Sequence, residues 1–220
     1  VVFKAHSGHM LTAAHVAAAI DRAVASSGVP AGVFNLIYGA GVGEALVKHP
    51  AIQAVGFTGS LRGGRALCDM AAARPQPIPV FAEMSSINPV IVLPQALQAR
   101  GEQIAGELAA SVVMGCGQFC THPGLVVGIR SPQFEHFVQT LAARMADQGP
   151  QTMLNAGTLR SYQSGVQHLL AHPGIQHLAG QPHTGNQAQP QLFKADVSLL
   201  LNGDPLLQEE VFGPTTVVVE

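Results

Sequence analysis

The sequence predicts an α/β fold built on parallel strands, and three observations support this prediction. Short apolar segments typical of strands alternate with segments whose apolar residues recur at helical spacing, which is the order of βαβ units. Residues 33–38 form the kind of apolar run found in buried strands. Glycine and proline separate the segments, as at Gly28, Pro30 and Pro50.

The first part of the chain alternates most clearly. Residues 1–4 are strand-like, and residues 11–26 carry Ala, Val and Ile at helical spacing before Gly28 and Pro30 end the helix. Right-handed crossovers then place the strands parallel in one sheet. The remaining elements predicted here are strands at 33–38, 52–57 and 79–83 and helices at 43–48 and 61–73.

The rest of the chain has longer helices. Residues 97–114 place Ile104, Leu108 and Val112 on one helical face. Residues 181–191 are rich in Gln, Gly, Pro, His and Asn, which predicts a surface loop. The other predicted elements are strands at 89–93, 125–129, 192–195 and 215–219 and helices at 134–147 and 159–171.

Composition excludes several classes of function. The 220 residues are 47% hydrophobic and 11% charged, which predicts extensive buried surface or contacts in a homo-oligomer. A net charge of −2 without a basic cluster gives no basis for nucleic-acid binding. Polar residues, glycine or proline interrupt every apolar run before it reaches membrane-spanning length, so we expect no membrane partner.

The three cysteines, Cys68, Cys116 and Cys120, do not form the pattern of a disulfide framework. Cys116 and Cys120 are four residues apart, but no second Cys or His pair has zinc-ligand spacing, so we expect no metal site. A reduced, cytoplasmic setting follows from this cysteine usage.

Three segments carry the candidate chemistry. They are the run from Gly117 to Gly124 (GQFCTHPG), the run from Phe81 to Pro89 (FAEMSSINP) and the run from Glu209 to Pro214 (EEVFGP). Together they resemble the aldehyde dehydrogenase superfamily, whose segments have the patterns G-Q-x-C, E-(L/M)-(G/S)-x-x-(N/S)-P and E-(I/V)-F-G-P. The resemblance spans essentially the whole chain, and one departure is Ser85, where glycine is commoner.

The resemblance implies a Rossmann-like cofactor-binding portion followed by an α/β catalytic domain. Residues 1–85 would be the later half of the NAD(P)-binding domain, and residues 86–220 a catalytic domain that is incomplete at its C-terminus. The chain starts without Met in one strand-like run and stops in another, so we expect an internal fragment of a longer enzyme. The isolated fragment should be inactive, since the family's oxyanion asparagine would precede it.

Cys120 is the candidate nucleophile, because a thiolate adds to a carbonyl and later leaves from a thioester. A lone cysteine is more often a buried structural residue, and we give that interpretation to Cys116. Glu83 ends an apolar strand, where partial desolvation would raise its pKa toward that of a general base, although a salt-bridged Glu is an equal alternative. The resemblance assigns Cys120 as nucleophile and Glu83 as base for thioester hydrolysis.

The candidate cofactor residues lie mainly at the ends of strands. Gly59 and Ser60 stand at a strand-to-helix junction, where Ser60 can cap the helix and backbone N–H groups can face a phosphate. The resemblance places this stretch by the cofactor pyrophosphate, and places Lys4 near the adenosine ribose. Ser7 stands where many NAD-preferring members carry Glu, so NADP or NAD is the expected cofactor. An ordinary helix cap and an exposed lysine are the alternatives.

Glu210 and Phe212 match family residues that contact the nicotinamide ribose and ring, although a packed turn also explains Phe212-Gly213-Pro214. The residues of the Glu83 and Cys120 segments most resemble those of family members that oxidise semialdehydes such as 2-oxoglutarate semialdehyde. The implied activity is oxidation of a small aldehyde to the acid through a thiohemiacetal and a thioester. A CoA-acylating enzyme, and an inactive fragment or assembly module, remain alternatives.

Overall fold

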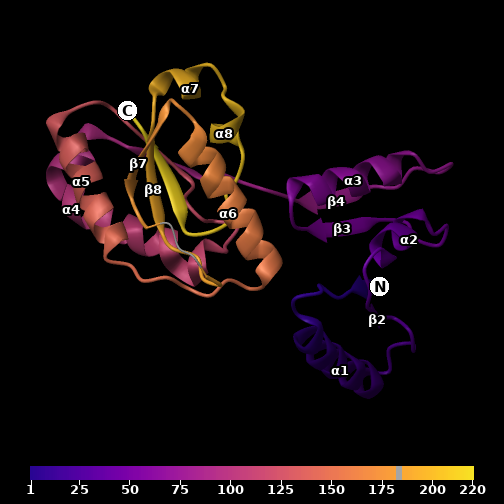
Figure 1. Ribbon diagram of the computed structural model, residues 1–220. Helices are drawn as coiled ribbons and strands as arrows, with labels where there is room; N and C mark the ends of the chain where they lie inside the picture. Colours follow the sequence, from indigo (N-terminus) through magenta and orange to yellow (C-terminus); the bar gives the residue numbers. More distant parts are fainter. Residues whose placement is uncertain (182–184) are drawn as a thin grey trace. The chain divides into compact units, whose positions relative to one another are not determined.

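A computed structural model describes residues 1–181 and 185–220 of the chain (Figure 1). The chain divides into two compact units, Val1–Met84 and Ser85–Glu220. The predicted loop at 181–191 falls partly on residues 182–184, which lie outside the described residues. No described helix is both long and apolar enough to cross a membrane.

The first unit contains two pairs of parallel strands, each joined by a helix. The prediction of one continuous sheet was wrong, because β2 pairs with β1, β4 pairs with β3, and the two pairs are separate sheets. Apolar patterning identifies a strand but does not encode which strand it pairs with. The elements are β1 (Val2–Lys4), α1 (Met10–Ser27), β2 (Asn35–Ile37), α2 (Val42–Lys48), β3 (Val55–Thr58), α3 (Leu61–Ala72) and β4 (Val80–Glu83).

The ends of these helices follow the sequence signals. Helix α1 stops at Gly28, whose φ of 68° is a left-handed conformation that costs glycine little. Helix α3 starts at Ser60, whose hydroxyl accepts a hydrogen bond from the Gly63 N–H at 3.2 Å. The capping role predicted for Ser60 is therefore confirmed.

The second unit is built on a five-stranded sheet of order β5-β6-β9-β8-β7. All neighbouring strands are parallel except β7 and β8. Strand β7 has a half-polar sequence and was missed by the sequence analysis. The strands are β5 (Pro89–Val92), β6 (Leu125–Gly128), β7 (Ile175–Ala179), β8 (Gln191–Ala195) and β9 (Thr215–Val219).

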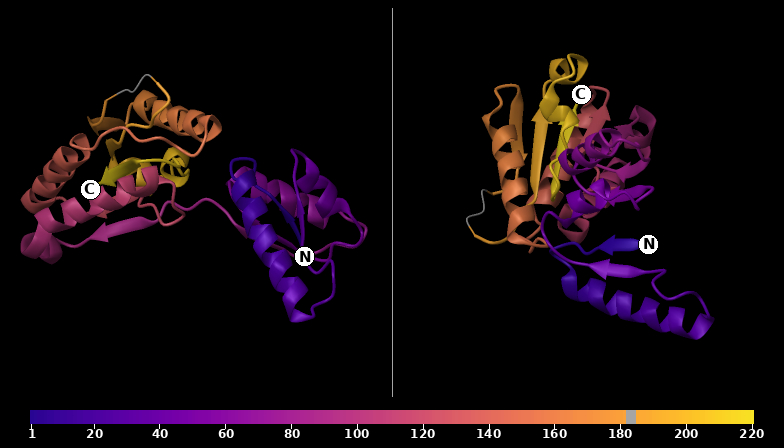
Figure 2. Two further views of the ribbon diagram at one scale, coloured as in Figure 1. Left: turned by 90° about the horizontal axis from the view of Figure 1, so that it is seen from below. Right: turned by 90° about the vertical axis from the view of Figure 1, so that its right-hand side faces the viewer.

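Helices cover both faces of this sheet, so the second unit has three layers (Figures 1 and 2). Helices α4 and α5 pack on one face and α6 on the other. Successive residues of β9 serve the two layers in turn, since Val218 joins the α4–α5 core and Val217 and Val219 join the α6 core. The helices are α4 (Pro94–Val113), α5 (Pro132–Ala146), α6 (Ala156–Ala171) and the short α7 (Val197–Leu201) and α8 (Pro205–Gln208), which the sequence analysis missed.

Candidate active site

The loop that carries Cys120 begins with a tight left-handed turn after helix α4. A 3-10 turn, Met114–Gly117, follows the helix, and Gly115, Cys116 and Gly117 all have positive φ. A Cβ on Gly117 would lie 2.3 Å from the backbone carbonyl carbon of Gly213, so only glycine permits this approach. The close approach brings the Cys120 segment against the segment of Glu210 and Phe212.

Asn88 also holds the Cys120 loop in place. Its side-chain amide donates to the backbone carbonyl of Cys120 at 2.8 Å and to that of His122 at 2.9 Å. The Ser86 hydroxyl donates to Asn88 Oδ1 at 3.0 Å, and Asn88 itself has a φ of 43°. Asn tolerates this left-handed conformation better than most residues. Two carbonyls of the loop are thus fixed by one side chain.

Two neighbouring cysteines have opposite environments. Cys116 is 2% exposed, its thiol donates weakly to the Gln151 carbonyl at 3.7 Å, and burial raises its pKa. Cys120 is exposed. Within the described residues its backbone N–H has no acceptor, so it is available to an oxyanion. The prediction that Cys116 faces the core is confirmed, and Cys120 is the exposed residue of the two.

Glu210 lies beside the start of the second unit. Its carboxylate accepts hydrogen bonds from the Ser85 side chain and the Ser86 backbone, while burial raises its pKa. Phe212 is 37% exposed and follows it in the same segment. Residues 85–88 therefore contact both the Cys120 loop and the Glu210 segment, so the part of the second motif that follows Met84 meets the other two motifs within the second unit.

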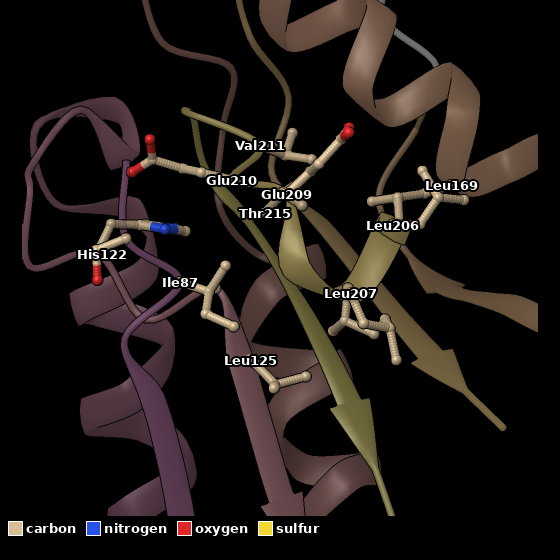
Figure 3. Close-up of a pocket in the computed structure, with 13 residues that line it drawn as sticks. Ile87, His122, Leu125, Leu169, Leu206, Leu207, Glu209, Glu210, Val211 and Thr215 are labelled. Atoms are coloured by element: carbon tan, nitrogen blue, oxygen red, sulfur yellow. The ribbon is translucent and has the colours of Figure 1, made fainter. Parts of the chain in front are cut away.

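A small cavity lies between the Cys120 loop and the Glu210 segment (Figure 3). The buried His122 lines it, and desolvation lowers the pKa of this imidazole to about 4. Across the cavity stand Glu209 and Glu210 with several leucines and valines. His122 therefore stays neutral at neutral pH.

Glu83 lies at the carboxyl end of β4 in the first unit. It pairs in register with Thr58 at the end of β3, and its backbone carbonyl accepts from the Gly59 N–H at 3.1 Å. Glu83 thus stands beside the Gly59-Ser60 turn that opens helix α3. The expected desolvation of Glu83 is not present in this unit, because the alternation of β4 places Phe81 and Glu83 on its exposed side.

Lys4 and Ser7 also lie at or just beyond the carboxyl end of a parallel strand. Lys4 ends β1, pairs with Ile37 of β2 and is half-buried, while Ser7 lies exposed in the turn before α1. Ligands of open α/β sheets bind beyond the carboxyl ends of strands, where all the candidate residues of this unit lie.

The sequence analysis assigned no role to Asn88 or His122. Asn88 was visible as part of the motif that ends in Asn88-Pro89, and His122 as a polar residue two positions after Cys120, but neither pattern reveals a hydrogen-bond partner. Across residues 1–181 and 185–220, no group of three or more His, Cys, Asp or Glu side chains is placed to hold a metal ion.

Comparison with known proteins gives a consistent result. The chain is 59% identical over its whole length to the alpha-ketoglutaric semialdehyde dehydrogenase of Acinetobacter baylyi and 47% identical to alpha-ketoglutaric semialdehyde dehydrogenase 2 of Azospirillum brasilense. It spans 42% of the length of each of these relatives.

Solved structures share the fold over the whole chain. A benzaldehyde dehydrogenase from Corynebacterium glutamicum, described as NAD-dependent, superposes with a TM-score of 0.82 at 24% identity, and the chain covers 48% of it. A glyceraldehyde-3-phosphate dehydrogenase from Methanocaldococcus jannaschii, complexed with NADP, superposes with a TM-score of 0.81 at 21% identity and the same coverage. The sequence profile described as "Aldehyde dehydrogenase family" matches residues 1–220. With its fold and its motif segments in place, the chain belongs to the aldehyde dehydrogenase family.

Proposed function

We propose that this chain supplies the nucleophile and the general base of an NAD(P)-dependent enzyme that oxidises a semialdehyde, such as 2-oxoglutarate semialdehyde, to the carboxylic acid. The observation that carries the proposal is the exposed Cys120 thiol on a loop whose carbonyls Asn88 fixes. The identity of 59% to a semialdehyde dehydrogenase supports the choice of substrate.

Cys120 performs the first step. Its thiolate adds to the aldehyde carbon, and the carbonyl oxygen becomes the oxyanion of a thiohemiacetal. The Cys120 backbone N–H is one donor for that oxyanion, because it has no acceptor in the described parts of the chain. Asn88 supports this role by fixing the adjacent Cys120 carbonyl.

The residues that would hold the cofactor suit a dinucleotide. Helix α3 is 12 residues long and starts at the carboxyl end of β3, the arrangement that favours a phosphate at a helix N-terminus. Glu210 would accept ribose hydroxyls, and Phe212 would flank the ring. Bound NAD(P) supplies the acceptor for the hydride of the thiohemiacetal. Ser7 places no carboxylate near a 2′-phosphate, so NADP should be accepted at least as well as NAD.

Glu83 performs the last step. Its carboxylate takes a proton from water, the resulting hydroxide attacks the thioester carbon, and Cys120 leaves as thiolate. Glu83 is exposed in its own unit, which leaves it accessible to water. A CoA-acylating enzyme would pass the acyl group to a thiol and would not need this base.

The test is a steady-state assay of the full-length protein with NAD and with NADP across a panel of semialdehydes. Formation of the free acid together with the reduced cofactor, abolished by Cys120→Ala, is the expected result. An acyl thioester formed only when coenzyme A is present would replace the proposal with the acylating alternative. We propose that the 220 residues alone turn over no aldehyde and that they associate with one another. Sedimentation of this chain measures the association.

A further inference from the structure

The cavity under the Cys120 loop is too small for a substrate. The space inside it that a water-sized group can occupy is only about 20 Å³. One water requires about 10–15 Å³ of such space. Most of its wall is apolar, and its polar groups come from a few residues. These are Ser86, His122, Glu209, Glu210 and Thr215. The size of the cavity therefore selects a single water over an aldehyde or a nucleotide.

His122 provides the first polar contact in this cavity. The residue is 5% exposed, and its Nε2 has no hydrogen-bond partner in the part of the chain that the structure describes. A buried ring nitrogen without a partner is costly, so such groups in folded proteins are nearly always paired with protein or water. Figure 3 shows the ring extending from the Cys120 loop toward the Glu210 segment.

Glu210 provides the second contact. Its carboxylate already accepts from Ser85 and Ser86, and an ionised carboxylate has about four acceptor sites, so it keeps capacity for another donor. Thr215 is a weaker candidate, because its hydroxyl already pairs with Tyr162 at 3.2 Å. Glu209 is exposed and can be satisfied by solvent.

We propose that this cavity is a water site in which one internal water joins Nε2 of His122 to the carboxylate of Glu210. His122 stays neutral in its buried position, so Nε2–H can donate to the water and the water can donate to the carboxylate. His122 is then a positioning residue for Glu210. It acts from the Cys120 loop, where its own carbonyl is held by Asn88.

The consequence for cofactor binding rests on the proposed function. If Glu210 holds the nicotinamide ribose, the bridge fixes the orientation of its carboxylate relative to the loop that carries Cys120. Groups that orient a ligating residue typically change affinity or activity by about 10- to 100-fold when removed, as measured at metal sites. The water bridge would thus couple the position of the Cys120 loop to the position of the nicotinamide ribose.

A crystal structure of the full-length protein, at a resolution that shows ordered water, is the first test. We expect one water within about 3.2 Å of both His122 Nε2 and a Glu210 oxygen. A direct protein partner for Nε2, or a cavity without density, overturns the proposal. This outcome is independent of whether the enzyme oxidises aldehydes, which the Cys120→Ala assay decides.

Two variants give the second test, with NADPH affinity measured by fluorescence. His122→Leu should weaken NADPH binding about tenfold, and His122→Gln, whose amide can reach the position of Nε2, should restore most of it. His177→Leu is the matched control, because His177 is bonded to Gln191 at 2.8 Å in the same unit and faces no part of this cavity. Unchanged affinity in folded His122→Leu overturns the positioning role. If His122→Leu does not fold, His122→Gln gives the test instead. A crystal structure of His122→Gln that lacks the water, together with NADPH affinity equal to that of the wild type, overturns the positioning role.

Discussion

The side-chain amide of Asn88 donates to the backbone carbonyl of Cys120 at 2.8 Å, although 32 residues separate the two in sequence. The same amide reaches His122, so a single residue on the segment after β4 fixes both sides of Thr121. The position of Cys120, the proposed nucleophile, therefore depends on the side chain of a residue from another segment of the chain.

Replacing Asn88 with glycine should lower kcat with little change in KM. Glycine keeps the left-handed φ of 43° but removes both hydrogen bonds, and a reacting group displaced by about 1 Å can lose about 100-fold in rate. Steady-state kinetics of Asn88→Gly and of Asn202→Gly, an exposed control in the same unit, make the comparison. Equal kcat in both variants would show that the loop keeps its geometry without Asn88.

Replacing Cys120 with alanine should abolish dehydrogenase activity, because no other exposed thiol lies on the loop. Cys116→Ala and Cys68→Ala should retain most of it, since Cys116 is buried among apolar side chains and Cys68 lies on helix α3 of the other unit. Activity assays of the three full-length variants check this. Substantial turnover by Cys120→Ala would remove it as nucleophile.

Replacing Glu83 with glutamine should slow deacylation and leave cofactor binding intact. The amide cannot take a proton from water, so one burst of reduced cofactor should precede a stalled steady state. Stopped-flow absorbance at the wavelength of the reduced nicotinamide measures the burst. Normal steady-state turnover would take Glu83 out of the mechanism.

Replacing Ser7 with glutamate should shift cofactor preference toward NAD. A carboxylate in this exposed turn would repel a 2′-phosphate, whereas Ser7 can donate a hydrogen bond to it. The ratio of kcat/KM for NADP and NAD in the parent and variant gives the answer, with His6→Gln as a neighbouring control. A parent enzyme that binds NAD far more tightly than NADP would contradict this interpretation.

The buried His122 should make the second unit sensitive to acid. Its pKa is lowered by burial from 6.5 to about 4, so the unfolded chain binds the proton first as the pH falls. The contribution of the neutral His122 to stability is fully present above about pH 6.5 and is lost as the pH falls from 6.5 to 4. At about 1.4 kcal/mol per pKa unit, this loss in the free energy of unfolding is on the order of 3 kcal/mol. Denaturant unfolding between pH 4 and 7 should show that the free energy of unfolding falls less steeply with decreasing pH in His122→Gln than in the exposed control His136→Gln. Equal slopes would mean that another group controls the loss.

Local sequence patterns predicted most helices and strands of this fold because apolar spacing and caps such as Ser60 and Gly28 act over a few residues. The pairing of β1 with β2 and of β3 with β4 as separate sheets could not be predicted, since pairing depends on distant contacts. The same distinction holds in the candidate site. Cys120 stands out in its motif, but its support by Asn88 and the burial of His122 arise only when segments from three parts of the chain pack together.

The contrast between the exposed Cys120 and the buried Cys116 has a practical consequence. An electrophile too bulky to enter the core should modify Cys120 and leave its neighbour four residues away untouched. In the second unit these are the only two thiols, so a folded unit should take one such label and an unfolded unit two, and the stoichiometry on that unit reports the fraction that is folded. A covalent probe could thereby measure how much of a preparation is folded around Cys120 before any substrate has been identified.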